Sequence, residues 1–410
     1  MKEANNLRVE RHILKSTNHY FDILMDFCYK SKNLYNHANY IIRQEFISNG
    51  NWIKYTELDK ILKADTEYND YTEMPTAQSA QQILRLIDKN WKSFFKSAKD
   101  WSKHKEKYLG RPKLPKYLKK NGRYLLIFTN QNCKVKDGYV HFPKVFKGFT
   151  IKPKFLNRED YESFQQVRII PHKNNLTIEL IYKIKACKKK VDNNRYIGID
   201  IGVSNLATVA NNIGETAFII NGRPLKSINQ FYNKQISHYR NICKRMNNRD
   251  YSERMGRLTE KRNVKVDDYL HKASRKIINY CIDNQINGIV VGKNKEWKQG
   301  TNIGKKNNQN FVQIPFARFI EMIQYKAEEH GIAVILTEES YTSGTSFIDD
   351  EQPTKENYNK SRRIERGLFK SNNGILINAD LNSAYQILKK VFPIKWDRGC
   401  ALHPSVVNII

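Results

Sequence analysis

The sequence predicts a multidomain α+β protein, in which a small β-barrel interrupted by a helical domain is followed by a domain of alternating strands and helices. Three patterns indicate this fold class. Apolar residues recur with period two in short segments of residues 123–195, and residues 1–15 add an edge strand. Residues 16–122 have the spacing of amphipathic helices. From residue 196 onward, apolar strands alternate with long helices.

The composition indicates a polyanionic partner. The 410-residue chain carries 71 Lys and Arg against 41 Asp and Glu, a formal net charge of +30. Such an excess repels itself unless a polyanion binds it. Nucleic acid is favoured over a membrane surface, because no apolar run approaches the roughly 20 residues of a spanning helix and no signal peptide is recognisable. The six cysteines are widely spaced without a C-x-x-C pair, which predicts neither disulfides nor zinc, and a reducing, cytoplasmic setting.

Two acids stand at the ends of well-formed motifs. An apolar β-hairpin over residues 196–210 carries Asp200 on its first strand. Far downstream, strand 375–377 runs into a helix with Asp380 at its start. A turn or a helix cap explains each acid alone. As a pair, they look like two walls of a metal site.

Together, these stretches resemble the first and third RuvC motifs of the TnpB family, transposon-encoded RNA-guided DNA nucleases related to type V CRISPR effectors. The resemblance extends to the first strand, a Gln-rich helix after Pro75 and a G-x-P-x-x-P linker at residues 110–115. It implies a wedge β-barrel with an inserted helical recognition domain, followed by a RuvC (RNase H-like) α/β nuclease domain. The implied ranges are 1–15 and 123–195 for the wedge, 16–122 for the recognition domain, 196–340 and 373–395 for the RuvC domain, 341–372 for an insert, and 396–410 for a C-terminal tail.

An RNase H-like site needs a third carboxylate. Family members usually have Glu at the end of the strand that closes here with Gly292. One candidate is Glu296, four residues on. The other is the pair Glu338 and Glu339, which resembles a TnpB subgroup in which the catalytic Glu has moved to this segment. Neighbouring strand residues face opposite sides, so only one of the pair can be the ligand. We favour Glu339, with Glu338 in reserve, and the alternative of a nuclease-dead protein stays open.

The insert departs from the family in a second respect. TnpB-like proteins usually carry a four-cysteine zinc finger there, whereas residues 341–372 contain no cysteine. Folding of this insert cannot depend on zinc thiolates, so we expect no zinc.

Several polar and basic residues are candidates for nucleic-acid contacts. Glutamine amides suit base edges, and the family resemblance implies that a helix like this one reads a short DNA motif beside the target; its candidates are Gln78, Gln81 and Gln82. Trp91, Trp101, Tyr108 and Tyr117 interleave with a basic run, as stacking on RNA would require. The candidates for RNA or DNA backbone contacts are Lys89, Lys92, Lys96, Arg111, Arg240, Arg245, Arg254 and Arg257.

The resemblance therefore implies an RNA-guided DNA endonuclease with a guide RNA and a double-stranded DNA target as partners. Its expected chemistry is phosphodiester hydrolysis by two Mg²⁺ ions, or Mn²⁺ in their place, held by Asp200, Glu339 and Asp380. Two alternatives remain: an RNA-guided DNA-binding repressor that does not cut, and a resolvase that needs no guide.

Overall fold

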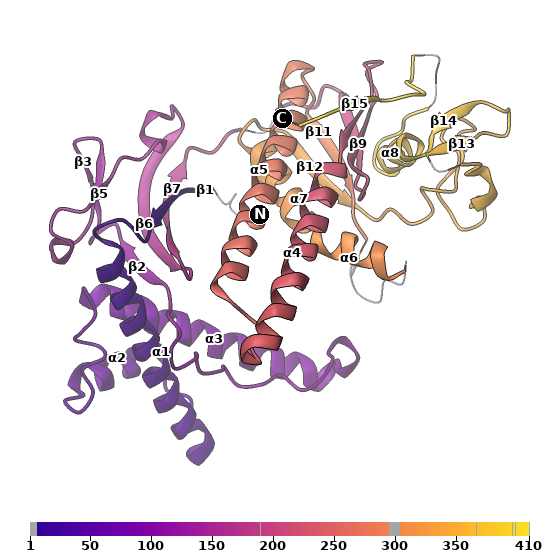
Figure 1. Cartoon of the computed structure of the whole chain (residues 1–410). Coiled ribbons are helices and arrows are strands. Elements are labelled where there is room, and N and C mark those ends of the chain that lie inside the picture. Colours follow the sequence, from indigo (N-terminus) through magenta and orange to yellow (C-terminus); the bar gives the residue numbers. More distant parts are fainter. Residues whose placement is uncertain are drawn as a thin grey trace. The chain divides into compact units, whose positions relative to one another are not determined.

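The computed structural model describes residues 6–188, 190–294, 304–365, 367–395, 397 and 399–409. The chain forms two compact units, Met1–Ala186 and Cys187–Ile410, and the order of their elements can be followed in Figure 1. None of the described helices is both long and apolar enough to cross a membrane.

The first unit contains two antiparallel sheets. The larger has the order β1-β7-β6-β2, built from β1 (Leu7–Lys15), β7 (Asn175–Ile184), β6 (Tyr161–Pro171) and β2 (Leu126–Thr129). The smaller has the order β3-β4-β5, built from β3 (Lys134–Lys136), β4 (Tyr139–His141) and β5 (Thr150–Ile151). Within the described part of the chain, β1 and β2 are open edges of the larger sheet.

The prediction of a closed barrel is therefore wrong. The sheet stays open because it shares one apolar core with the helices. Phe128, Val167 and Leu180 of the sheet belong to the same cluster as Leu24 and Trp91 of the helices. The helices cover the apolar face that a barrel would enclose by pairing its edge strands, so closure is not needed to bury it.

Three helices provide this cover, namely α1 (Phe21–Asn49), α2 (Tyr55–Ala64) and α3 (Ala77–Lys103). Thr76 caps α3, because its side chain accepts a hydrogen bond from the Ser79 N–H and the Ser79 hydroxyl accepts one from the Thr76 N–H. Pro75 thus lies just before the cap rather than in the helix. Short 3₁₀ turns follow as η1 (Lys105–Lys107), η2 (Lys144–Phe146) and η3 (Phe155–Asn157).

The second unit is built on a six-stranded mixed sheet of order β12-β11-β8-β9-β10-β15. Its strands are β12 (Ala333–Thr337), β11 (Gly288–Gly292), β8 (Tyr196–Asp200), β9 (Asn205–Asn211), β10 (Phe218–Asn221) and β15 (Ser405–Val407). Strands β8, β11 and β12 are mutually parallel, and β9 returns antiparallel to β8 as the predicted hairpin. The segment expected as a tail supplies β15, which pairs with β10.

Helices cover both faces of this sheet. They are α4 (Arg223–Asn247), α5 (Glu253–Asp283), α6 (Lys305–Gln313), α7 (Phe316–Glu328) and α8 (Ala379–Lys389). Ile199 and Val291 share a core with α5 and α7, whereas Val290 packs with Leu388 of α8. Alternate strand residues point to opposite faces, so Asp200 and Gly292 are on the side of α8. A Cβ at Gly198 would lie 2.3 Å from a carbonyl oxygen of α8, so glycine permits this close packing.

The cysteine-free insert packs on α8 through side chains. It contains η4 (Lys360–Arg362) and β13 (Leu368–Lys370), which pairs with β14 (Leu376–Asn378). The Phe347 ring stacks on Tyr385 of α8 at 4.5 Å between centroids. Glu351 pairs with Arg362 at 2.6 Å, and its backbone carbonyl accepts a hydrogen bond from Gln386.

Candidate active site

Parallel strands bring two of the predicted acids to one edge of the sheet. Asp200 is the last residue of β8, and Glu339 follows the last residue of β12 by two positions. Strand β11, which ends at Gly292, lies between them. Because parallel strands end at the same edge, all three positions face one region.

Helix α8 contributes the third acid to this side of the sheet. The Asn378 side chain caps the helix by accepting hydrogen bonds from the N–H groups of Asp380 and Leu381, each at 3.1 Å. Asp380 is therefore not the cap. Its Oδ2 accepts a hydrogen bond from the Asn205 amide at 2.7 Å, and its Oδ1 pairs with the Arg363 guanidinium at 3.0 Å.

Glu339 is held by Asn294, which follows β11. The Asn294 amide donates to Oε1 of Glu339 at 3.0 Å, and the Asn294 Oδ1 accepts from the Glu339 N–H at 3.1 Å. A Cβ at Gly292 would lie 2.9 Å from the other carboxylate oxygen, Oε2. Glu339 thus reaches from the end of β12 over the end of β11, into the space that a side chain at Gly292 would fill.

The electrostatics show that the acids influence one another. Burial raises the pKa of Asp200 well above its usual range, and the negative charges of Asp380 and Glu339 raise it further, while Arg363 opposes them. Burial also raises the pKa of Glu339 to about 7, against the lowering effect of Lys390. Carboxyl groups that lie close together in a partly buried site resist ionisation, because their negative charges repel one another. A bound cation would relieve this repulsion.

The three acids fit a hard divalent cation in chemistry, because carboxylate oxygens are the ligands that Mg²⁺ prefers. They do not yet form a ready coordination sphere. Across the described ranges, no three His, Cys, Asp or Glu side chains stand close enough to hold a metal ion. Arg363 supplies positive charge on Asp380, so metal binding at Asp380 Oδ1 would require that ion pair to open.

The two reserve acids differ from Glu339. The Glu338 side chain is exposed and accepts a hydrogen bond from the Ser340 hydroxyl at 2.8 Å. Glu296 lies outside the described residues. The placement of Glu339 against Gly292 is thus the observation that distinguishes it from Glu338.

Sequence reasoning missed the residues that hold the acids, namely Asn205, Asn294, Arg363 and Lys390. Lys390 donates to the backbone carbonyls of Glu338 and Ser340, each at 2.8 Å, and so fixes the segment that carries Glu339. Only Asn378 had a local signal, because Asn is a preferred cap residue just before a helix.

The glutamines expected to read DNA are already engaged to different degrees. The Gln78 amide contacts Gln131, and its Oε1 accepts from the Thr129 hydroxyl at 2.9 Å. Gln81 hydrogen-bonds to Tyr71. Gln82 is partly exposed.

The basic run on α3 faces solvent, but its first aromatic residue does not. Trp91 is 0% exposed and donates its indole N–H to Asn39 at 3.1 Å, so the prediction that it stacks on RNA is wrong. It completes the core instead. All four backbone candidates of this unit are exposed, namely Lys89, Lys92, Lys96 and Arg111, and Lys92 also pairs with Asp88 at 2.6 Å.

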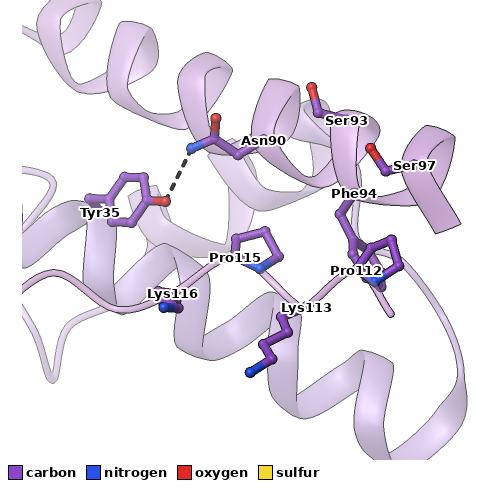
Figure 2. A pocket seen from close by; sticks show the side chains of 9 residues that line it. All are labelled: Tyr35, Asn90, Ser93, Phe94, Ser97, Pro112, Lys113, Pro115 and Lys116. Atoms are coloured by element: carbon purple, nitrogen blue, oxygen red, sulfur yellow. Dashed lines mark hydrogen bonds between the residues drawn. The ribbon is translucent and has the colours of Figure 1, made fainter. Parts of the chain in front are cut away.

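An open cleft of about 420 Å³ lies between α3 and the linker that follows it (Figure 2). Its lining residues are Tyr35, Asn90, Ser93, Phe94, Ser97, Pro112, Lys113, Pro115 and Lys116. Asn90 donates to the Tyr35 hydroxyl at 3.1 Å across its floor. No acid lines the cleft, so its hydroxyls and ammonium groups suit an anionic chain.

A second basic surface lies on α4 and α5, which run side by side in Figure 1. Its exposed arginines include the four candidates Arg240, Arg245, Arg254 and Arg257. The Arg254 guanidinium lies over the Tyr239 ring at 4.4 Å from its centroid. This contact stiffens the arginine without neutralising its charge.

The fold and the acid-lined sheet edge define a mixed α+β protein with a candidate acidic active site. Comparison with known families is more specific. Residues 177–298 match the OrfB_IS605 family, described as "Probable transposase", and residues 316–387 match the Cas12f1-like TNB domain.

Curated relatives agree with these families. The chain is 23% identical over 394 residues to the TnpB-like protein ORF457 of Acidianus two-tailed virus, which covers 88% of this chain and 81% of the relative. It is 24% identical over 279 residues to the CRISPR-associated endodeoxyribonuclease Cas12f2 of a Micrarchaeota archaeon, covering 63% of this chain and 47% of that protein. Together, the family matches and these relatives support a TnpB-family protein related to type V CRISPR effectors.

Solved structures also align with the chain at low similarity. A Cas12f1–sgRNA–target DNA complex aligns with a TM-score of 0.38 and 15% identity, covering 94% of this chain and 100% of the other. A CRISPR–Cas12f ternary complex aligns with a TM-score of 0.37 and 17% identity, covering 89% and 81%.

Proposed function

We propose that this protein is an RNA-guided DNA endonuclease that hydrolyses phosphodiester bonds at Asp200, Glu339 and Asp380. The observation that carries the proposal is that the ends of β8 and β12 and the first turn of α8 bring three acids to one end of the sheet, where the charges of Asp380 and Glu339 add to burial in raising the pKa of Asp200. Three acids from separate elements that act on one another at a sheet edge are the arrangement such chemistry needs. The name of the relative Cas12f2, an endodeoxyribonuclease, supports the same reaction class.

Each residue of the site has a proposed role that follows from its position. Mg²⁺, or Mn²⁺ in its place, would supply Lewis-acid stabilisation and an activated water at the three carboxylates. Asp200 would bind the metal from the end of β8, together with Glu339 from the segment after β12 and Asp380 from the start of α8. Asn294 and Asn205 orient these two flanking carboxylates by hydrogen bonds. Arg363, released from Asp380, could neutralise the bound phosphate backbone.

Sequence specificity would come from base pairing between a guide RNA and one DNA strand. The exposed arginines of α4 and α5 would contact the backbone of that heteroduplex. The cleft beside α3 would seat another stretch of nucleic-acid backbone on its hydroxyl and ammonium groups (Figure 2). Among the three glutamines, Gln82 is the best candidate to read a short duplex motif, because Gln78 and Gln81 already have partners.

Cleavage of guide-complementary DNA by the protein–RNA complex tests the proposal. Asp200→Ala should abolish cutting while target binding persists, and Glu339→Gln should do the same. Glu296→Gln should leave cutting largely intact. If Glu338→Gln is the inactivating change instead, the third ligand has been assigned to the wrong neighbour.

The rival function is guided DNA binding without cutting. One observation favours it, namely that both Asp380 oxygens are engaged by Asn205 and Arg363. Binding affinity cannot separate the two functions, since both need the same RNA and DNA contacts. A wild-type complex that binds its target but leaves it intact across Mg²⁺ and Mn²⁺ concentrations would establish the rival.

A further inference from the structure

The carboxylate of Glu339 is held by residues outside its own strand. It sits past the end of β12, where the chain has left the regular ladder. A glutamate there has several torsions and would sample many directions. Two residues of the adjoining strand end and loop limit it, Gly292 and Asn294.

Asn294 acts on both the backbone and the side chain of Glu339. Its Oδ1 accepts from the Glu339 N–H at 3.1 Å, and its amide donates to Oε1 at 3.0 Å. An amide that bonds the same residue twice fixes the direction of the side chain as well as the position of the main chain. The Asn294 amide donates to Oε1 alone, so the other carboxylate oxygen of Glu339, Oε2, can bind another partner.

Gly292 supplies the space for that second oxygen. A Cβ there would lie 2.9 Å from Oε2 and 3.3 Å from the Cβ of Glu339. Since β11 lies between β12 and β8, an Oε2 above the end of β11 is directed toward the strand that carries Asp200. Even a methyl group at Gly292 would therefore crowd the carboxylate, as well as Cδ1 of Ile387, from which the added Cβ would lie 2.6 Å.

We propose that Gly292 and Asn294 are positioning residues that aim Oε2 of Glu339 at the metal site shared with Asp200. The proposal rests on the proposed function and adds a division of labour to it. Asn294 holds Oε1 by an outer hydrogen bond, and the absent side chain of Gly292 keeps the path of Oε2 open. Outer partners of this kind typically change metal affinity by about 10–100-fold when removed.

Mn²⁺ binding to the full-length protein–guide RNA complex tests this proposal. Electron paramagnetic resonance would measure bound Mn²⁺, and subtraction of the Asp200→Ala complex removes the ions held by RNA. We expect Asn294→Ala and Gly292→Ala each to raise the half-saturating Mn²⁺ concentration about tenfold. The Mg²⁺ concentration for half-maximal cleavage should rise in parallel.

Two matched controls lie at the opposite end of the sheet. Gly288→Ala, on the same strand, would bring a Cβ to 2.8 Å from the Tyr196 ring, a clash similar to that at Gly292. Asn212 is also doubly bonded, accepting from the Tyr196 N–H at 2.7 Å and donating to the Asn194 carbonyl at 2.8 Å. Gly288→Ala and Asn212→Ala should lower thermal stability comparably and leave Mn²⁺ affinity within about twofold of wild type, because neither touches an outer partner of the acids.

The outcomes separate the possibilities. Wild-type Mn²⁺ affinity in both test variants would overturn the positioning role, as would an equal loss in the controls, which would reduce the effect to general destabilisation. Should Asn294→Ala fail to fold, Gly292→Ala still decides, since it leaves the Asn294 side chain itself unchanged. If the Asp200→Ala complex binds Mn²⁺ and cuts DNA like wild type, the proposed function itself fails, and this inference with it.

Discussion

At the scale of single residues, the acids of the sheet edge should make the metal-free protein sensitive to pH. Burial raises the pKa of Glu339 to about 7 and also raises that of Asp200. A carboxyl whose pKa is raised on folding stabilises the protein fully below its unfolded value of about 4, and this contribution is lost as pH rises through the folded value. Without divalent metal, thermal stability should therefore fall as pH rises from about 4 to about 7, and level off above about pH 8.

Glu339→Gln removes the charge but keeps the shape, so its melting temperature should fall less over the same pH interval. Differential scanning calorimetry of both proteins in a chelator measures the difference. Glu338→Gln is the matched control, because its exposed side chain should leave the pH dependence as in wild type. Parallel curves for wild type and Glu339→Gln would show that Glu339 ionises freely in the folded protein.

The residues around the acids could not be predicted as the acids were. Asp200 and Asp380 stand in local patterns, a hairpin and a helix start, that the sequence displays. Arg363 meets Asp380 only because the insert folds back on α8, and Asn294 meets Glu339 only because β11 and β12 are neighbours. Such contacts depend on tertiary packing, for which a single sequence has no periodic signal.

At the scale of elements, α8 should depend on Gly198. An added Cβ would lie 2.3 Å from the Ala384 carbonyl and 2.8 Å from the Leu388 Cβ. A backbone oxygen cannot turn aside like a side chain. Gly198→Ala should therefore lower the free energy of unfolding by about 1–3 kcal/mol or more, as overpacking of a core does. Chemical denaturation measures this loss. Because α8 carries Asp380, DNA cleavage should fall even where the variant stays folded.

Gly110→Ala is the control for this substitution, since a Cβ there meets nothing within 4 Å. It should leave both stability and cleavage close to wild type. A Gly198→Ala protein as stable as wild type would mean that α8 can move outward without cost, and the close packing on β8 would then not be what places Asp380.

The insert should be stabilised by an ion pair where the family usually uses zinc. Glu351 and Arg362 lie 2.6 Å apart with side chains only 15% and 16% exposed. Burial alone would raise the pKa of Glu351, but its hydrogen bonds and the charge of Arg362 lower it. Glu351→Gln leaves Arg362 mostly buried without its counter-charge, which should cost about 3 kcal/mol. Denaturation in a zinc chelator should leave wild type unchanged and reveal this loss in the variant.

The sign of the pH dependence follows from the same pair. Because folding lowers the pKa of Glu351, its contribution is present above the unfolded value of about 4 and is lost at lower pH. Lys272→Gln on α5 removes an exposed pair with Asp268 and should cost less than about 1 kcal/mol. Equal effects of Glu351→Gln and Lys272→Gln would show that the pair does not hold the insert.

Individual strands and helices were easier to predict from the sequence than the way they pack together. The hairpin of β8 and β9, the long helices α4 and α5, and the parallel strands β11 and β12 all follow from apolar periodicity. Barrel closure did not, because edge pairing is a non-local property that α1 and α3 made unnecessary. Trp91 shows how two sequence signals can conflict. Its helical spacing with Ile87 and Phe94 predicted packing, whereas its basic neighbourhood predicted stacking on RNA, and the ring is buried.

At the scale of the whole molecule, the charge of +30 predicts RNA binding that weakens steeply with salt. The four candidate arginines of this surface on α4 and α5 should contribute individually, because all four are exposed. If each contacts one phosphate, replacing Arg240, Arg245, Arg254 and Arg257 by Gln should reduce the slope of log K against log salt by about 3 units. Titration of guide RNA and of the guide–target heteroduplex at several salt concentrations measures that slope.

A quadruple Arg→Lys variant at the same positions is the control for charge. It keeps four positive charges, so its slope should match wild type even if the loss of guanidinium geometry weakens binding uniformly. A wild-type slope in the Gln variant would place the phosphate contacts elsewhere in the chain, such as the cleft beside α3. The reduction should be larger on heteroduplex than on free RNA if this surface holds the paired strands, because a duplex releases more counterions per contact than a single strand.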